Sequence, residues 1–281
     1  MHIQHVEVGN FRKLKAVRID FSKETTVFVG ANNSGKTSAM VALRRFLVDR
    51  SEFSINDFTL SHWGKIDAAA VKWEATDEND VPEPIDWGSF APFLDVWLAV
   101  PANELHYVQK ILPTLDWDGT CIGVRLRFEP KDALALQHEY LTVKRAAAAV
   151  MAKAGDGVEE PGEKSGAAST FALWPRSMMD FLAQRMRSIF EVRAYLLDPD
   201  KLKAPDSGKA YPQLLPENSD SIDGDPFHGL IRIDEISAQR GFGHAGQSGA
   251  LRGNDPREDF AEPRTGKKLS SQLRNYYTQH L

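Results

Sequence analysis

The chain has 281 residues and a net charge of −5, from 34 Lys and Arg against 39 Asp and Glu. A chain of this length can bury a core without covalent staples. Its single cysteine, Cys121, excludes an intramolecular disulfide framework and a Cys-rich zinc site. No stretch approaches the ~20 consecutive apolar residues of a membrane span, and the first residues lack the layout of a signal peptide. We therefore expect a cytoplasmic protein with no membrane partner.

Charge is distributed unevenly along the chain. Residues 1–50 hold nine Lys and Arg against four Asp and Glu, whereas residues 51–120 hold three against thirteen. Residues 240–281 return to seven basic against four acidic residues. A polyanion is therefore expected to meet the two ends of the chain rather than its middle. Ordinary solvated faces are the alternative interpretation.

The N-terminal residues predict a β-hairpin that leads to a strand and a helix. Residues 2–8 and 17–21 read as strands, and the second alternates apolar with charged side chains. The connection 9–15 is long enough to reverse the chain. Residues 25–29 are β-branched and apolar and predict a third strand, followed by a helix over 37–49. The expected apolar stripe of this helix consists of Met40, Leu43, Phe46 and Leu47.

The middle of the chain predicts a mixed lobe of strands and helices. Alternating or continuous apolar runs indicate the strands, and Ala- and Leu-rich segments without breakers indicate the helices. The expected strands are 93–100, 121–128 and 190–196, and the expected helices are 103–112, 132–153 and 176–189.

Four polar side chains in the expected strands 2–8 and 121–128 each allow two interpretations. Arg125 and Arg127 fall on one face of a strand, where they either touch phosphates or form a solvent-facing stripe. His2 and His5 are either a metal-binding pair or strand-surface residues. Cys121, in an apolar strand, is expected to be a small core residue.

The C-terminal third has the composition of linkers or lids. Residues 199–229 carry five of the fifteen prolines, and residues 241–266 carry six of the twenty glycines. Residues 268–281 resume helical spacing and stop without Gly or Pro, which predicts that the sequence is an N-terminal part of something longer. The expected domains are a nucleotide-binding core (1–60), a mixed lobe (61–198) and a loop-rich segment (199–281) with a strand at 230–236 and a terminal helix.

One motif carries chemistry. Residues 30–37, G-A-N-N-S-G-K-T, match the pattern G-x-x-x-x-G-K-[ST] between a predicted strand and a predicted helix. Glycines let such a loop wrap a phosphate, and backbone N–H groups with the positive helix end supply an anion site. Lys36 is expected to reach the β- and γ-phosphates, and the Thr37 hydroxyl to bind Mg²⁺. The predicted ATP-binding residues are Gly30, Ala31, Asn32, Asn33, Ser34, Gly35, Lys36, Thr37 and Ser38.

The hairpin and the loop together resemble a known family. Residues 10–14 (N-F-R-K-L) and 29–38 (V-G-A-N-N-S-G-K-T-S) look like the start of SMC/RecF-type ATPase heads. Within that group they are most similar to the OLD (overcoming lysogenisation defect) family of ATP-dependent endonucleases. The specific match covers about the first 60 residues.

This resemblance implies a fold, partners and a further site residue. The implied fold is an α/β P-loop NTPase of ABC/SMC-head type with an N-terminal β-hairpin and a mixed, partly antiparallel lobe. The implied activity is on DNA, in repair or phage defence, with a TOPRIM-type nuclease domain following the head in OLD proteins. Two heads would sandwich ATP, as a homodimer or with a partner head. By the same resemblance Arg12 is a second phosphate contact, and a solvated hairpin residue is the alternative.

The sequence also departs from the family pattern. A Leu-Ser-Gly-Gly-like signature is absent, and the weak candidate for a Walker B strand is 230–235, L-I-R-I-D-E. There Asp234 would hold Mg²⁺ through water and Glu235 would activate the attacking water. Arg232 interrupts what should be a buried strand, so a half-exposed strand is the alternative. The missing parts are expected beyond Leu281.

Three functions remain open at this point. The first is the ATP-binding head of a DNA-directed ATPase, the ATPase half of an OLD-like endonuclease, which hydrolyses ATP only with further motifs or a partner. The second is a small-molecule kinase, with Arg240, Arg252 and Arg257 in a lid. The third is a non-catalytic ATP-binding regulatory subunit.

Overall fold

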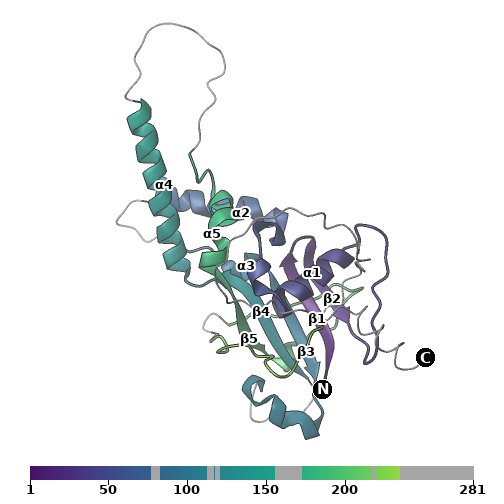
Figure 1. Ribbon diagram of the computed structural model, residues 1–281. Coiled ribbons are helices and arrows are strands. Elements are labelled where there is room, and N and C mark those ends of the chain that lie inside the picture. The colour runs from purple at the N-terminus through teal and green to yellow at the C-terminus, as the bar shows by residue number, and fades with distance from the viewer. Residues whose placement is uncertain (77–82, 113–116, 118–120, 156–172, 217–218, 235–281) are drawn as a thin grey trace, which may run out of the picture. The chain divides into compact units, whose positions relative to one another are not determined.

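A single antiparallel sheet organises the structure. The computed structural model describes residues 1–234 apart from 77–82, 113–116, 118–120, 156–172 and 217–218 (Figure 1). Five strands lie in the order β2-β1-β3-β4-β5, and each neighbouring pair runs antiparallel. The strands are β1 (His2–Phe11), β2 (Leu14–Asp20), β3 (Phe93–Ala99), β4 (Ile122–Pro130) and β5 (Phe190–Leu197).

The predicted hairpin is confirmed, with a tighter turn than expected. Phe11 of β1 pairs with Leu14 of β2, so only two residues form the turn. Its backbone is unusual because Asn10 and Arg12 both have a φ of 52°. A Cβ atom at Gly9 would lie 2.1 Å from the ring of Phe93, so this position needs a glycine. The close packing brings β1 and β3 together directly behind the turn.

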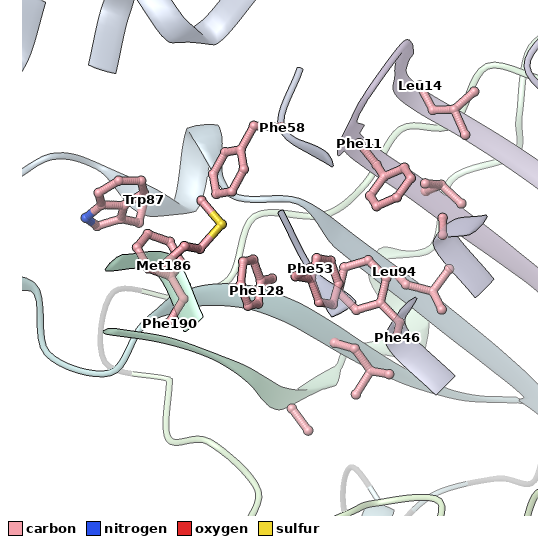
Figure 2. Close-up of a cluster of buried hydrophobic side chains, with 14 of the residues drawn as sticks. Phe11, Leu14, Phe46, Phe53, Phe58, Trp87, Leu94, Phe128, Met186 and Phe190 are labelled. Atoms are coloured by element: carbon pink, nitrogen blue, oxygen red, sulfur yellow. The ribbon is translucent and has the colours of Figure 1, made fainter. Parts of the chain in front are cut away.

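One face of the sheet packs against helices to form the main core. Helices α1 (Lys36–Leu47), α2 (Leu60–Ala75) and α5 (Met178–Ile189) contribute buried side chains to it. Aromatic rings fill its centre, where Phe53 stacks on Phe128 with ring centroids 4.1 Å apart (Figure 2). The strand residues in this core include Val6, Val8, Leu94, Val96, Leu98, Val124, Leu126 and Phe128.

The helices of the middle lobe meet around one tyrosine. Tyr140 of α4 (Ala133–Gly155) lies against Trp73 of α2 and Phe181 of α5, with ring centroids 6.4 and 5.5 Å away. Its hydroxyl donates to Glu74. The predicted helices 132–153 and 176–189 are therefore confirmed, whereas α2 and the short helix α3 (Trp87–Phe90) were not predicted.

The opposite face of the sheet is polar and covered. The described residues of the segment 199–222 cross it, because Ala210 donates its backbone N–H to the backbone oxygen of Ala16 on β2 and Ile222 donates its N–H to that of Ala194 on β5. Trp97, Leu197 and the buried Cys121 form a small second cluster under this segment, with Leu202 and Leu215 packed against it. The prediction that Cys121 is a core residue is confirmed.

A row of charged residues lies on this covered face. Arg125 of β4 is a buried partner of Asp95 on β3, with Nε–Oδ1 and Nη2–Oδ2 distances of 2.7 Å. The expectation that Arg125 touches phosphates or solvent is therefore wrong. Arg127 on the same face pairs with Glu129 at 2.5 Å and stacks over the ring of Tyr195. The linker-like segment 199–222 turns a face that would be solvated into an interior one.

The expected strand 25–29 is a second correction. These residues form no strand, and Val27 and Val29 are 73% and 88% exposed. A strand needs a neighbour to accept its backbone hydrogen bonds, and β2, which precedes it, pairs on its outer edge with Lys209. Among the described residues no other strand lies beside 25–29.

Three further expectations differ in detail. Met40 is 52% exposed, and α1 instead buries Ala39, Ala42 and Phe46. Residues 103–112 form two 3₁₀ helices, Ala102–Tyr107 and Gln109–Ile111, rather than one α-helix. The strand expected at 230–236 does not form over 230–234, and its last two residues lie outside the described part. The terminal helix expected at 268–281 also lies outside it.

The sheet and its core join segments from the whole described chain. Strands β1 and β2 share one sheet with β3 to β5, and Phe227 belongs to the same hydrophobic cluster as Val6. Residues from 1–60, 61–198 and 199–234 thus contribute to one hydrophobic core. Within the described ranges, no helix is both long enough and apolar enough to cross a membrane.

The charged row makes stability depend on pH. Glu7 is buried on β1 opposite Asp95, and burial, followed by the nearby Asp95, raises the pKa of Glu7 to about 7. Asp20 on β2 acts in the same direction, whereas Arg18 on β2 and Arg125 on β4 oppose it. Because the unfolded chain loses this proton near pH 4.5, folding becomes less favourable between pH 4.5 and 7, and the loss persists above pH 7.

We expect Glu7→Gln to remove this loss of stability with rising pH. The contribution of Glu7 to the free energy of unfolding should fall by up to about 3 kcal/mol between pH 5 and pH 8, so the free energy of unfolding of the variant should rise by this amount relative to that of the wild type. Urea titrations at both pH values measure the difference. The exposed Glu24→Gln is the matched control, and an equal pH slope in the wild type and Glu7→Gln would contradict the assignment.

His5 limits stability on the acid side. Its ring is buried and stacks on Trp97 at a centroid distance of 5.7 Å, so the expectation of a strand-surface residue is wrong. Burial, followed by Arg18, lowers the pKa of His5 to about 4. Stability is therefore lost as the pH falls from 6.5 to 4. Together with Glu7, this places the stability maximum contributed by this face at about pH 5–6.

Candidate functional site: a phosphate-binding loop

The loop 30–37 leads into α1, whose first two residues are Lys36 and Thr37. Asn33 and Gly35 have φ values of 69° and 94°, so the loop makes two left-handed bends before α1 begins at Lys36. No side chain caps the N-terminus of α1, and its first turn contains no acidic residue. The first backbone N–H groups of α1 are therefore open, in the arrangement that attracts an anion.

Lys36 folds back over the loop. Its Nζ donates to the backbone oxygen of Gly30, to that of Ala31 at 2.7 Å and to the Ser34 hydroxyl at 3.2 Å. A Cβ atom at residue 30 would lie 2.9 Å from Ser34 Oγ and 3.7 Å from Lys36 Nζ, so the loop closes this tightly only around a glycine. Hydrogen bonds to two backbone oxygens and one hydroxyl hold the ammonium group at the loop.

A cavity of about 250 Å³ opens beside the loop. It is lined by residues 32–38 and, from the β1–β2 turn, by Lys13. Thr37 in its wall is exposed, so its hydroxyl is available to a metal ion. The structure thus brings together Asn32 to Ser38 with Lys13, and the lining includes two lysines and no carboxylate.

Arg12 and Lys13, neighbours in the turn, point to different partners. Arg12 Nε and Nη2 both lie 2.8 Å from the carboxylate atom Oδ1 of the fully buried Asp57. The backbone N–H of Arg12 donates to the backbone oxygen of Asp57 at 2.9 Å. Lys13 Nζ donates to the side-chain oxygen of Asn33 in the loop. Sequence reasoning selected Arg12 and missed Lys13, whose only signal was its place in the same basic turn.

The remaining candidates among the described residues do not line this cavity. Asp234 is exposed and pairs with Arg232 at 3.2 Å, and Glu235 lies outside the described residues, as do Arg240, Arg252 and Arg257. His2 and His5 belong to no metal-ligand set, because no three His, Cys, Asp or Glu residues of the described chain converge on one point.

The part of the chain that contains this loop is similar to known ATPase domains. Residues 1–104 match a family model described as an AAA ATPase domain. Over 76 residues the chain is 34% identical to the DNA replication and repair protein RecF of Lysinibacillus sphaericus, covering 26% of this chain and 20% of that protein. Over 51 residues it is 43% identical to RecF of Nitrosococcus oceani, covering 18% of this chain and 14% of that protein.

These matches concern only part of each protein. The chain aligns with a fifth or less of the length of these two RecF relatives. A solved structure from work on the ATP-driven dimerization and DNA-stimulated activation of SMC ATPases is 19% identical, with a TM-score of 0.26, over 45% of this chain and 63% of that one. Residues 1–104 are similar to AAA ATPase domains, and a part of the chain is similar to a part of RecF.

Proposed function

We propose that this chain is the ATP-binding head of a DNA-directed ATPase. The observation that carries the proposal is the loop 30–37, which combines a tight glycine turn, the uncapped N-terminus of α1 and Lys36 beside an open cavity. The similarity of residues 1–104 to AAA ATPase domains supports the same function.

The residues of the site fit a triphosphate with Mg²⁺. Backbone N–H groups at the start of α1 would cradle the phosphates, and Lys36 would exchange the backbone oxygens of Gly30 and Ala31 for phosphate oxygens. The exposed Thr37 hydroxyl would be a ligand of Mg²⁺, which would neutralise charge on the phosphates. The donors are hydroxyl, ammonium and amide groups, which is the set that this ligand requires.

DNA and a second head are the proposed partners. Similarity to RecF, a DNA replication and repair protein, supports DNA as the macromolecule that this head acts on. A homodimer or a partner head that closes over ATP would supply groups that the loop itself lacks. An OLD-like ATP-dependent endonuclease, in DNA repair or phage defence, is the more specific form of the proposal and rests on the resemblance of residues 10–14 and 29–38.

The proposal predicts that duplex DNA stimulates ATP turnover. Phosphate release by the purified chain is measured with and without linear duplex DNA, and with a panel of small phosphate acceptors. We expect DNA to raise the rate and the acceptors to leave it unchanged. Phosphorylation of an acceptor would instead indicate the kinase. ATP binding without any turnover is the result expected of a regulatory subunit and equally of a head that lacks its partner.

A further inference from the structure

The β1–β2 turn reaches the phosphate-binding loop with one particular side chain. Lys13 is exposed, its Nζ donates to Asn33 Oδ1, and it lines the same cavity of about 250 Å³ as residues 32–38. The two residues it bridges are 20 positions apart in the sequence. Lys13 is thus the one residue outside the loop and α1 that lines this cavity among the described residues.

The turn that carries Lys13 is anchored from behind. Asp57 is fully buried and accepts from Arg12 Nε at 2.8 Å and from the backbone N–H of Ser54 at 3.0 Å. The backbone of the turn is tied to the same segment, since Thr59 donates its N–H to the oxygen of Asn10. These contacts direct the guanidinium of Arg12 to Asp57, so the cation of the turn that reaches the loop is the ammonium of Lys13.

The two lysines of the cavity contact different parts of the loop. Lys36 contacts the backbone oxygens of residues 30 and 31, where the loop begins, and the Ser34 hydroxyl, whereas Lys13 contacts the side chain of Asn33. The loop amides and the helix N-terminus enclose the inner phosphates of a bound nucleotide. A cation on the exposed side then meets the phosphate that these groups do not enclose, which a triphosphate has and a diphosphate lacks.

We propose that Lys13 is a second phosphate-binding cation of this site and that it makes the site prefer a nucleoside triphosphate to a diphosphate. The inference rests on the proposed ATP binding at residues 30–37. It assigns to Lys13 the contact that the resemblance to ATPase heads assigns to Arg12.

The test compares the affinities for Mg–ATP and Mg–ADP in matched variants. One charge-assisted hydrogen bond contributes about 1.5–3 kcal/mol, so we expect Lys13→Ala to weaken ATP binding about 10- to 100-fold and ADP binding much less. Lys13→Arg should retain most of the preference for ATP. Lys15→Ala, the control, removes the same charge from an exposed position of the same hairpin that does not line the cavity, and should leave the preference unchanged.

Two outcomes would overturn the assignment. The first is a ratio of ATP to ADP affinity in Lys13→Ala equal to that of the wild type and of Lys15→Ala. The second is loss of the preference in Arg12→Ala but not in Lys13→Ala, which would return the contact to Arg12. In both cases the wild type binds ATP and the proposed function stands. A folded wild-type chain that binds no ATP would contradict the proposed function itself, and the role of Lys13 with it.

Discussion

Replacing Lys36 by alanine is expected to abolish Mg–ATP binding while the chain stays folded. The Lys36 ammonium contacts only loop atoms, at Gly30, Ala31 and Ser34, so its removal leaves the hydrophobic core intact. Charge-assisted hydrogen bonds to two phosphates, each contributing about 1.5–3 kcal/mol, together correspond to a loss of affinity of at least about 100-fold.

Competition against a fluorescent ATP analogue measures this loss, and circular dichroism melting checks the fold. Lys23→Ala is the control, because Lys23 is an exposed lysine upstream of the same loop that does not line the cavity. We expect unchanged melting in both variants and unchanged ATP affinity in the control. Wild-type ATP affinity in Lys36→Ala would show that nucleotide binds elsewhere.

Among the substitutions proposed here, Arg125→Met is expected to cause the largest loss in the free energy of unfolding. The Arg125 and Asp95 side chains are 6% and 1% exposed and share two 2.7 Å contacts, and the Arg125 guanidinium also lies 4.4 Å from the centre of the Phe93 ring. Without Arg125, the Asp95 carboxylate is buried and unpaired beside Glu7, the cross-strand neighbour of Asp95. Breaking a buried pair in this way costs about 3–5 kcal/mol.

Urea unfolding of single and double variants separates the cost of leaving Asp95 unpaired from the contribution of the ion pair itself. Asp95→Asn combined with Arg125→Met removes both charges, and we expect it to recover much of the loss. Arg176→Met is the matched control, since Arg176 is 70% exposed and its contact with Asp180 is 3.5 Å long; such pairs contribute about 0–1 kcal/mol. Equal losses in Arg125→Met and Arg176→Met would contradict the assigned role of the buried pair.

The sequence predicted the elements whose patterns are local. The strands of the hairpin, β3, β4 and β5, and the helices α4 and α5 follow from alternation and from breaker-free Ala- and Leu-rich runs, with ends displaced by one or more residues. Helix α2 was missed although Ile66, Ala70 and Trp73 lie at helical spacing. Gly64 and the charged residues of α2 obscured that stripe.

The predictions that were wrong concern features that depend on residues far away in the sequence. The face that carries Arg125 was identified correctly from alternation, but whether it meets water depends on residues 199–222, which cover it from more than 70 positions away. Residues 25–29 have the composition of a strand, yet pairing requires a neighbour that composition does not reveal.

The same reasoning applies within the site. The loop 30–37 could be selected as the candidate site from the sequence, because its pattern is contained in eight consecutive residues. The choice between Arg12 and Lys13 could not, because it depends on Asp57, 45 positions later, whose buried carboxylate binds the guanidinium of Arg12. The resemblance named Arg12, and the contacts of the turn are the basis of our proposal that Lys13 makes this contact instead.

Titrating the wild-type chain with Mg–ATP, followed by backbone amide chemical shifts, tests the central claim most directly. We expect saturable binding at one ATP per chain, with the largest shifts in residues 30–38 and in Lys13. Amides of the remote polar row, such as that of Asp95, should change little. A folded chain that shows no saturable shifts, or shifts confined to residues outside the loop and the β1–β2 turn, would contradict the assignment of residues 30–37 as the ATP site.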